Sequence, residues 1–376
     1  MVLDLLLRPI RLQPFFGYRN GSRLHISARA LRTRAPDFGQ AAGRWQAFRT
    51  MMAQFRSREV AELPVRLEVA RSSGGGAWFD AVTDKEGFVH FDVELAGARG
   101  HKGHPEWETV VLHWEDRHGA HAADAFVLAP GGETRLAIIS DIDDTIIESG
   151  ITGGIGQLAR NWRRVLAELP SERLLVPGAD LFYNALGGGA VLPEGESHLG
   201  ERRPASNNPF FYISSSPWNL FSYLVAFQRG RGLPLGPLML RDWGLNAQTF
   251  GKASHGSHKR VAIDRLFAFY PDMDFALVGD DTQADLVAFG ETVARWPGRV
   301  RAVFVRQAGE ALSPEEIAAR DTILAAQVPL WLGADYASGH DFLERIGMGM
   351  DEPAHKVMAT TVKAGSPPAA AGGGAA

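Results

Sequence analysis

The chain has 376 residues, 45% of them apolar, and a formal net charge of −4. This length allows two domains with a core each, and the slightly acidic balance argues against a general nucleic-acid binder. The absence of cysteine excludes disulfides, thiolate metal sites and cysteine nucleophiles. No window approaches the roughly 20 consecutive apolar residues of a membrane-spanning helix, so we expect a soluble protein.

Residues 1–130 are expected to form the smaller, β-rich domain of the chain, an antiparallel sandwich. Several of its segments alternate polar and apolar residues, as half-buried strands do, and glycine and aspartate turn signals separate them. The segments with this pattern are 23–31, 64–69, 88–93 and 109–114.

A helix is predicted over residues 44–58 of this first half. Trp45, Phe48, Met52 and Phe55 recur at helical spacing, with arginines around them. We expect the aromatic face to pack on the sandwich, because such stripes usually belong to a core. A basic amphipathic helix on a membrane surface is the alternative.

From residue 131 to 350 the pattern changes to strands that alternate with helices, which indicates an α/β domain with a parallel sheet. A glycine-rich polar stretch, 187–208, is either a lid or a disordered insert. The tail, 351–376, is expected to be disordered. The predicted strands are 136–139, 210–213, 275–278, 300–305 and 328–332, and the predicted helices are centred on 155–166, 220–227 and 263–270.

Two carboxylates follow the first of these strands directly. Asp141 comes first and Asp143 two positions later, so both side chains point the same way if the chain stays extended. Ligands bind at the carboxyl ends of strands in open α/β sheets, and buried acids there are costly unless a cation or a reaction uses them. Phosphate esters can be hydrolysed by a carboxylate nucleophile while a second acid protonates the leaving oxygen. We therefore predict Asp141 as nucleophile and Asp143 as acid/base.

A second group of acids follows the strand 275–278. Asp280 is predicted to bind Mg²⁺ directly, because this ion prefers oxygen ligands and an anionic nucleophile needs a cation beside an anionic substrate. Asp285 or Asp281 would bind the waters of the ion or orient its neighbours.

Serines follow the strand 210–213. Ser216 is predicted to cap a helix that has Pro217 at its first position. A helix N-terminus with a hydroxyl beside it suits a phosphate group, and Ser214 is the predicted phosphate contact.

A lysine is expected to complete the site. Lys259 lies four residues before Ile263 and shares the inward face of its helix, so its ammonium can hold both the nucleophile and the transferring phosphoryl group. Lys252 is the alternative.

In this order, the residues resemble the four motifs of the haloacid-dehalogenase-like phosphohydrolase superfamily. The stretches 139–146, 211–220 and 277–280 are further similar to the catalytic domain of actin-patch-protein-type phosphatidate phosphatases, and the resemblance covers roughly residues 131–345. The four motifs are carried here by Asp141-x-Asp143-x-Thr145, by Ser214, by Lys259 and by Gly279-Asp280 with Asp285.

The resemblance implies a Rossmann-like parallel sheet and hydrolysis of phosphatidate to diacylglycerol and phosphate through an aspartyl-phosphate. It implies Mg²⁺ held by Asp141, by the backbone carbonyl of Asp143 and by Asp280, with Asp285 in the metal site. Ser214, Ser215 and Thr145 would contact the substrate phosphate. The expected protein is cytoplasmic, contacts the inner membrane surface peripherally and binds no nucleic acid.

Two departures from the family and two alternatives bear on the substrate. The family usually has Asn at the position of Ser215, and a Ser-Gly-Gln-His-Asp-Pro run where this chain has residues 281–286. A phosphatase for soluble phosphomonoesters, or a non-catalytic binding module on the same fold, are the competing hypotheses. A lipid enzyme should expose an apolar rim near Trp218 and Leu220.

Two histidine pairs with three-residue spacing, His101/His104 and His255/His258, are expected in surface loops.

Overall fold

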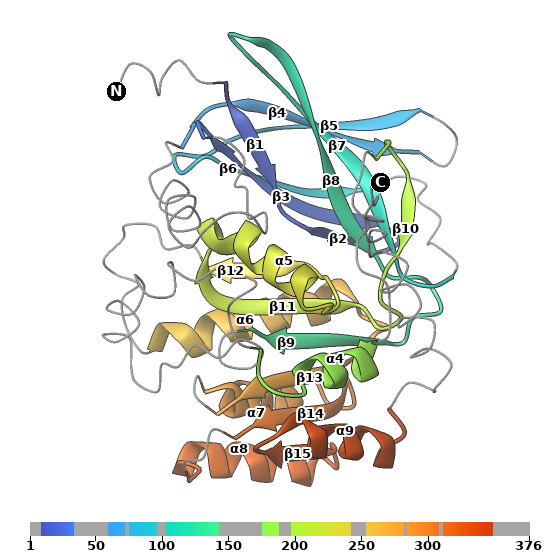
Figure 1. The fold of residues 1–376 in the computed structure, drawn as a ribbon, viewed down its shortest axis with the longest axis vertical. Helices are drawn as coiled ribbons and strands as arrows, with labels where there is room; N and C mark the ends of the chain where they lie inside the picture. Colours follow the sequence, from blue (N-terminus) through green and yellow to red (C-terminus); the bar gives the residue numbers. More distant parts are fainter. Residues whose placement is uncertain are drawn as a thin grey trace, which may run out of the picture.

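The computed structural model describes residues 9–33, 59–71, 75–95, 103–142, 175–187, 197–241, 253–281, 284–307 and 311–348. Within these ranges the chain forms a nine-stranded mixed sheet and a six-stranded parallel sheet with helices on both faces (Figure 1). None of the helices in this part of the chain is long and apolar enough to cross a bilayer. Outside the described residues lie the predicted helices 44–58 and 155–166, the predicted tail, Asp143, Thr145 and Lys252.

The first sheet has the order β1-β3-β2-β8-β7-β4-β5, with β6 paired to β3 and β10 to β7. Neighbours are antiparallel except for β2 and β8, which run parallel, so the expected purely antiparallel arrangement is wrong at that pair. All four predicted strands are present, in β3, β4, β6 and β7. The bounds are β1 Arg11–Pro14, β2 Gly17–Arg19, β3 Arg23–Leu31, β4 Pro64–Ala70, β5 Gly76–Val82, β6 Phe88–Glu94, β7 Glu106–Asp116, β8 Gly119–Ala129 and β10 Arg202–Pro204.

Alternation of side chains explains the core of this first sheet. Leu24 and Ile26 of β3, Val65 of β4 and Leu112 of β7 are fully buried and belong to one apolar cluster, whereas the residues between such positions point to the other face of the sheet. The sheet therefore curls over a core of its own.

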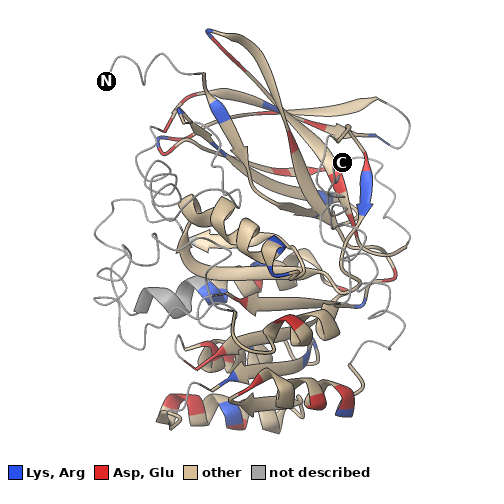
Figure 2. Ribbon diagram, viewed as in Figure 1, with Lys and Arg blue, Asp and Glu red and all other residues tan. Residues whose placement is uncertain are grey.

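The second sheet has the order β12-β11-β9-β13-β14-β15 and all its pairs are parallel. Its central strands are continuous apolar runs, as expected for strands buried on both faces, and the ribbon of β11 carries no charged residue (Figure 2). The predicted α/β class is thus confirmed. The strands are β9 Leu136–Asp141, β11 Phe210–Pro217, β12 Leu238–Arg241, β13 Asp274–Asp280, β14 Val300–Arg306 and β15 Leu330–Gly333.

Two apolar clusters cover the two faces of this sheet. Side chains of α4, α5 and α9 pack on one face against Ile138, Tyr212 and Val278, and side chains of α6, α7 and α8 pack on the other against Ile139 and Leu277. The helices are α4 Ala179–Gly187, α5 Phe221–Gly230, α6 Ala253–Phe269, α7 Asp285–Arg295, α8 Pro314–Ala325 and α9 Tyr336–Arg345, and a 3₁₀ turn, η1, spans Trp218–Leu220.

The two sheets are joined by more than the short connection from β8 to β9. Strand β10, which comes from between α4 and β11, crosses back and pairs with Glu106–Glu108 of β7. Helix α5 lies between the sheets (Figure 1), where Phe221 contacts Phe15 and Phe16. The predicted domain boundary near residue 130 falls in the β8–β9 connection, but residues on both sides of it build the first sheet.

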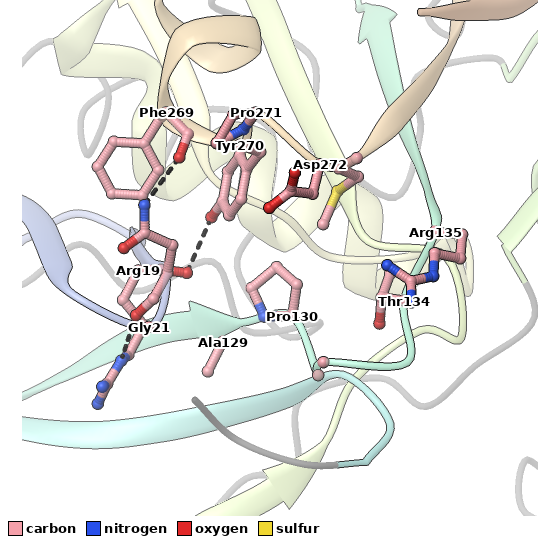
Figure 3. A pocket seen from close by; sticks show the side chains of 14 residues that line it. Arg19, Gly21, Ala129, Pro130, Thr134, Arg135, Phe269, Tyr270, Pro271 and Asp272 are labelled. Carbon is pink, nitrogen blue, oxygen red and sulfur yellow. Dashed lines mark hydrogen bonds between the residues drawn. The ribbon is translucent and has the colours of Figure 1, made fainter. Parts of the chain in front are cut away.

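A cavity of about 210 Å³ lies where the two sheets meet (Figure 3). It is lined by the β2–β3 turn, the β8–β9 connection and the turn that leads from α6 into β13. Strands β9 and β13 both begin at this end of the sheet. The cavity is therefore at the edge opposite to the carboxyl ends of the strands, where ligands of open α/β sheets bind.

Near this cavity, His25 of β3 is half-buried against α6. Arg265 donates a hydrogen bond to its Nδ1 atom at 2.9 Å. Burial and the charge of Arg265 lower the pKa of His25 to about 3, while Asp92 opposes them. The imidazole is therefore neutral in the folded protein.

This environment predicts a pH dependence of stability. The unfolded chain protonates His25 below a pKa of about 6.5, and the folded chain does not, so stability falls as the pH drops from that value towards the folded pKa. Relative to a His25→Gln variant, the wild type should lose about 1 kcal/mol of unfolding free energy between about pH 7 and about pH 5.5. Urea titrations of both proteins measure this, and an unchanged difference would contradict the prediction.

Candidate active site

Three neighbouring strands of the second sheet end at the same edge with polar residues. In the ladder, Asp141 of β9 is paired with Ile213 of β11, and Ser140 with Val278 of β13. The residues that follow these partners, Ser214 and the Gly279-Asp280 pair, therefore lie beside Asp141. The parallel topology thus gathers side chains that are far apart in the sequence.

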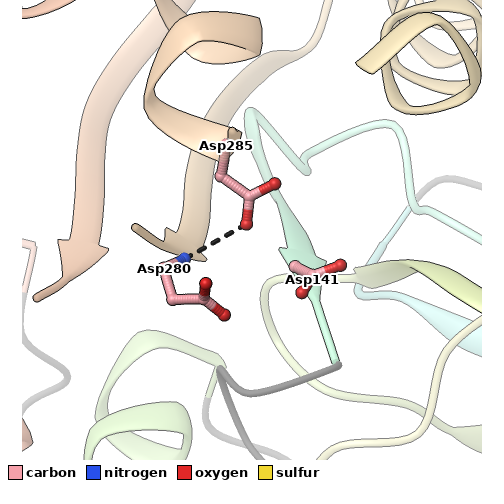
Figure 4. Close-up of side chains that lie close together, drawn as sticks. All are labelled: Asp141, Asp280 and Asp285. Carbon is pink, nitrogen blue, oxygen red and sulfur yellow. Dashed lines mark hydrogen bonds between the residues drawn. The ribbon is translucent and has the colours of Figure 1, made fainter. Parts of the chain in front are cut away.

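Three carboxylates converge at this edge. Oxygen atoms of Asp141, Asp280 and Asp285 all lie within 4.8 Å of one another, and all three side chains are buried (Figure 4). They come from the last residue of β9, the last residue of β13 and the first residue of α7. Among the described residues, these three aspartates form the cluster of possible ligands that could hold a metal ion.

Asp285 is held by both of its carboxylate oxygens. Oδ2 accepts a hydrogen bond from the backbone N–H of Asp280 at 3.1 Å, and Oδ1 accepts one from Lys259. Gly279 makes this approach possible, since a Cβ atom at that position would lie 2.4 Å from Oδ2 of Asp285. The residue before Asp285, Ala284, adopts a left-handed conformation, with φ 62°, that turns the chain from β13 into α7. Both oxygens are thus already used in positioning their neighbours.

Lys259 is buried with its ammonium between two acids. Its Nζ atom lies 3.2 Å from Oδ1 of Asp141 and also contacts Asp285. Burial tends to lower the pKa of Lys259, but the two carboxylates outweigh it and the pKa is raised, so the ammonium stays charged. As the helical spacing predicts, Ile263 on the same face of α6 is buried in the core.

The charges of these side chains suit a further cation. Three carboxylates lie beside one ammonium, and burial raises the pKa of Asp285 to about 6 even though Lys259 opposes it. Buried carboxylates are stable only when paired, protonated or bound to metal. Carboxylate oxygens are ligands of hard divalent ions. Both oxygens of Asp285 are engaged by neighbouring groups, so Asp141 and Asp280 are the candidates to bind such an ion directly. The donor set therefore fits a metal.

A chain of buried hydroxyl groups lies beneath Asp141. Ser140 donates a hydrogen bond to the backbone carbonyl of Asp141 at 2.7 Å, so its oxygen accepts the one from Tyr183, also at 2.7 Å. Tyr183 is in turn hydrogen-bonded to Tyr336. Burial raises the pKa of Tyr183 well above its usual value, so the phenol remains neutral. This chain fixes the peptide at which β9 ends.

The serines near the end of β11 differ from the prediction at Ser216. Ser214 is fully buried and its Oγ atom accepts a hydrogen bond from the N–H of Ser216 at 3.0 Å, while Ser215 is 9% exposed. Strand β11 continues to Pro217 and a 3₁₀ turn precedes α5, so the prediction that Ser216 caps the helix is wrong. The N-cap of α5 is Leu220, which has no capping side chain.

Of the two residues near which an apolar rim is expected, Leu220 is buried and Trp218 is half-buried. The ring of Trp218 packs against Phe15, between β1 and β2, and against Phe88 of β6, with ring centroids 4.3 and 6.0 Å apart. The sequence could not show this, because the covering residues are remote in the chain. Of the histidine pairs, His104 is exposed as predicted and His101 lies outside the described residues. His255 and His258 lie in α6, so the prediction of a loop is wrong for that pair.

Sequence reasoning missed three residues that shape the site. Ser140 and Tyr183 carry no motif, and only their contacts reveal them. Gly279 was noted only as part of the Gly-Asp pair, although a glycine before an acid at a strand end is a signal for close approach of another side chain. Asp143, Thr145 and Lys252 lie outside the described residues.

The Gly279→Ala variant tests the packing around Asp285. The new Cβ should displace the carboxylate and cost roughly 1–3 kcal/mol of stability, as overpacking of a full site does. Gly230→Ala is the matched control, since a Cβ there meets nothing within 4 Å. Urea unfolding of both variants checks this, and equal stability of the two would contradict the arrangement.

Comparison with known proteins identifies the segment that contains this site. Residues 136–307 match the family described as the catalytic domain of phosphatidate phosphatase APP1. The Saccharomyces cerevisiae protein of that name is 27% identical over 178 residues, which are 47% of this chain and 27% of that protein. An uncharacterised protein of Schizosaccharomyces pombe is 24% identical over 234 residues, 61% of this chain and 34% of that one.

The chain thus spans about a quarter to a third of the length of these two relatives. Among solved structures, the alignment with a β-glucuronidase of Bifidobacterium dentium covers 86% of this chain and 59% of that chain, with 9% identity. Its TM-score is 0.23, which is too low to indicate a shared fold. The family match begins at β9, ends after β14 and includes Asp141, Ser214, Lys259, Asp280 and Asp285. The resemblance recognised in the motifs is therefore confirmed over residues 136–307, which match the family of phosphatidate phosphatase APP1 catalytic domains.

Proposed function

We propose that this protein is a Mg²⁺-dependent phosphatidate phosphatase with a haloacid-dehalogenase-like catalytic domain. The observation that carries the proposal is the buried cluster of Asp141, Asp280, Asp285 and Lys259 at the carboxyl edge of the parallel sheet. A phosphoric monoester hydrolase needs a nucleophile, a cation and a fixed positive charge for the transferring group. The cluster contains a candidate nucleophile, Asp141, a fixed charge, Lys259, and carboxylates that would hold the cation, all within the segment that matches the family.

In the proposed reaction, a carboxylate oxygen of Asp141 attacks the phosphorus of the substrate. The bond from phosphorus to the alcohol oxygen breaks, and Asp143 gives the leaving alkoxide its proton. Asp143 then takes a proton from a water molecule, which attacks the aspartyl-phosphate and releases inorganic phosphate. Lys259, which Asp285 holds in place, would orient Asp141. Its ammonium would also stabilise the phosphoryl group that Asp141 receives.

Asp141 and Asp280, with the backbone carbonyl of Asp143, would hold Mg²⁺. Asp285 would orient the site through its hydrogen bonds with Lys259 and with the backbone N–H of Asp280. When bound, the ion would neutralise charge on the nucleophile and the phosphate. Ser214, Ser215 and Thr145 are the proposed contacts of the phosphate oxygens. Ser214 and Ser215 adjoin Asp141 through the pairing of β11 with β9, which supports their role.

The lipid substrate is supported by the family match and by the name of the S. cerevisiae relative. A lipid substrate implies peripheral contact with a membrane, and we propose the cytoplasmic face of the inner membrane for it. The soluble-substrate alternative is supported by the burial of Leu220 and by the packing of Trp218 against Phe15.

An Asp141→Asn variant tests the nucleophile. The amide keeps the size of the side chain but cannot form the acyl-phosphate, so kcat should fall by at least about a thousandfold. Asp272→Asn, at the opposite edge of the sheet, is the matched control and should keep its activity. Circular dichroism confirms that both variants fold. Turnover within tenfold of the wild type in Asp141→Asn would rule out this role.

A substrate panel tests the reaction and the ion. Phosphate release is measured from phosphatidate in mixed micelles, lysophosphatidate, glycerol 3-phosphate and p-nitrophenyl phosphate, each with Mg²⁺ and after chelation with EDTA. Phosphatidate should give the highest kcat/KM, and chelation should abolish release until Mg²⁺ is restored. A higher kcat/KM for glycerol 3-phosphate would favour the soluble-substrate alternative. No release from any substrate would favour the binding module.

A further inference from the structure

Among the contacts that the first sheet makes with the catalytic half of the chain, two groups of hydrogen bonds lie in separate places. At the end of α6, the Asn20 side chain donates a hydrogen bond to the carbonyl of Phe269 at 2.8 Å, and the Tyr270 hydroxyl donates one to the carbonyl of Arg19 at 3.1 Å. These contacts lie near the cavity, away from the carboxyl edge. The second contact is made by Arg29 and involves the turn that follows the phosphate-binding serines.

Arg29, in β3, is a buried arginine whose guanidinium bridges three segments. Its Nε atom donates to the carbonyl of Glu86 at 3.0 Å, Nη2 donates to Glu59 at 3.2 Å, and Nη1 donates to the side-chain oxygen of Asn219 at 2.9 Å. The guanidinium also lies over the ring of Phe88, 4.5 Å from its centroid. Asn219 is thereby attached to the first sheet by a donor that packing holds in one orientation.

The residues on either side of Asn219 are held by the same sheet. The ring of Trp218 is 4.3 Å from that of Phe15, and the ring of Phe221 is 4.9 Å from Phe15. The turn Trp218–Leu220 is thus fixed from the side of the first sheet by an aromatic cluster and by the Arg29 hydrogen bond.

The local structure leaves this turn dependent on such contacts. Its N-cap, Pro217, makes no capping hydrogen bond through a side chain. The pairing of β11 with β12 also shifts register between Ile213 and Pro217, so the ladder is irregular across the three serines. The ladder with β9 fixes the strand as far as Ile213, and beyond it the path through the serines to the turn also depends on tertiary contacts.

We propose that Arg29 is a positioning residue for the phosphate-binding serines, acting through Asn219. This inference rests on the proposed function, and it gives the first sheet a part in catalysis without contact with the substrate. The guanidinium fixes Asn219, Asn219 fixes the turn, and the turn holds Ser214 and Ser215 beside Asp141.

The test compares Arg29→Met with Arg19→Met. Arg19 is equally buried and also pairs with a glutamate, Glu108, at 2.8 Å, but its side chain does not contact the turn in the described structure. kcat/KM is measured with Mg²⁺ on phosphatidate and on p-nitrophenyl phosphate, with the folded fraction determined by thermal unfolding. Arg29→Met should lower kcat/KM about 10- to 100-fold on both substrates, as a small misplacement of binding groups does. The kcat/KM of Arg19→Met should stay within about twofold of the wild-type value when the proteins are compared at equal folded fraction.

Two further measurements separate positioning from general stability. In an Asn219→Ala background, Arg29→Met should have little added effect on kcat/KM, because the two residues act through one contact. Hydrogen exchange of the backbone amides of 214–220 should be faster in Arg29→Met and unchanged in Arg19→Met. If Arg29→Met does not fold, Arg29→Lys replaces it, since lysine keeps the charge but cannot bridge the three acceptors.

The outcomes distinguish this inference from the proposed function. Equal losses of kcat/KM in the two arginine variants, or unchanged exchange of 214–220 in Arg29→Met, overturn the positioning role. A wild-type protein that releases no phosphate from either substrate overturns the proposed function instead. The exchange measurement, which needs no activity, then decides whether Arg29 fixes the turn.

Discussion

The ammonium of Lys259 is buried against two carboxylates, those of Asp141 and Asp285. Burial of ions is costly unless the geometry is good and the remaining hydrogen-bonding capacity is satisfied. The surroundings meet this demand, because the second oxygen of Asp285 accepts the N–H of Asp280, and Gly279 leaves room for it. The orientations of Asp285 and of the proposed nucleophile, Asp141, therefore depend on the same ammonium.

The parallel sheet brings the strand ends of the site together, which the ion pair alone could not do. Strands β9, β11 and β13 are neighbours and parallel, so their last residues meet at one edge although they lie far apart in the sequence. Apolar clusters on both faces hold the strands, and the helices that carry Lys259 and Asp285 belong to one of these clusters. On the other face, Tyr183 reaches Ser140 and ties α4 to the end of β9. The site is thus fixed from both layers of helices.

Much of the second sheet could be predicted, because its buried strands are apolar runs followed by polar residues. The convergence of Asp141 with Asp280 followed from the rule that ligands bind at the carboxyl ends of parallel strands. Long-range features could not be predicted in this way. Trp218 looked like a surface residue because nothing in its own segment shows that Phe15 and Phe88 cover it. Ser216 had the composition of a helix cap, but the strand continues past it.

Strand β10 was not predicted either, since three residues of the sequence Arg-Arg-Pro have no strand pattern. It completes the pairing of Glu106–Glu108 in β7. During synthesis, residue 202 is added roughly 5 to 20 s after residue 108 at usual elongation rates. For that time the outer edge of a long strand has no partner from β10. Glu106 places a charge on that edge, which discourages pairing with another nascent chain until Arg202 is added and pairs with it.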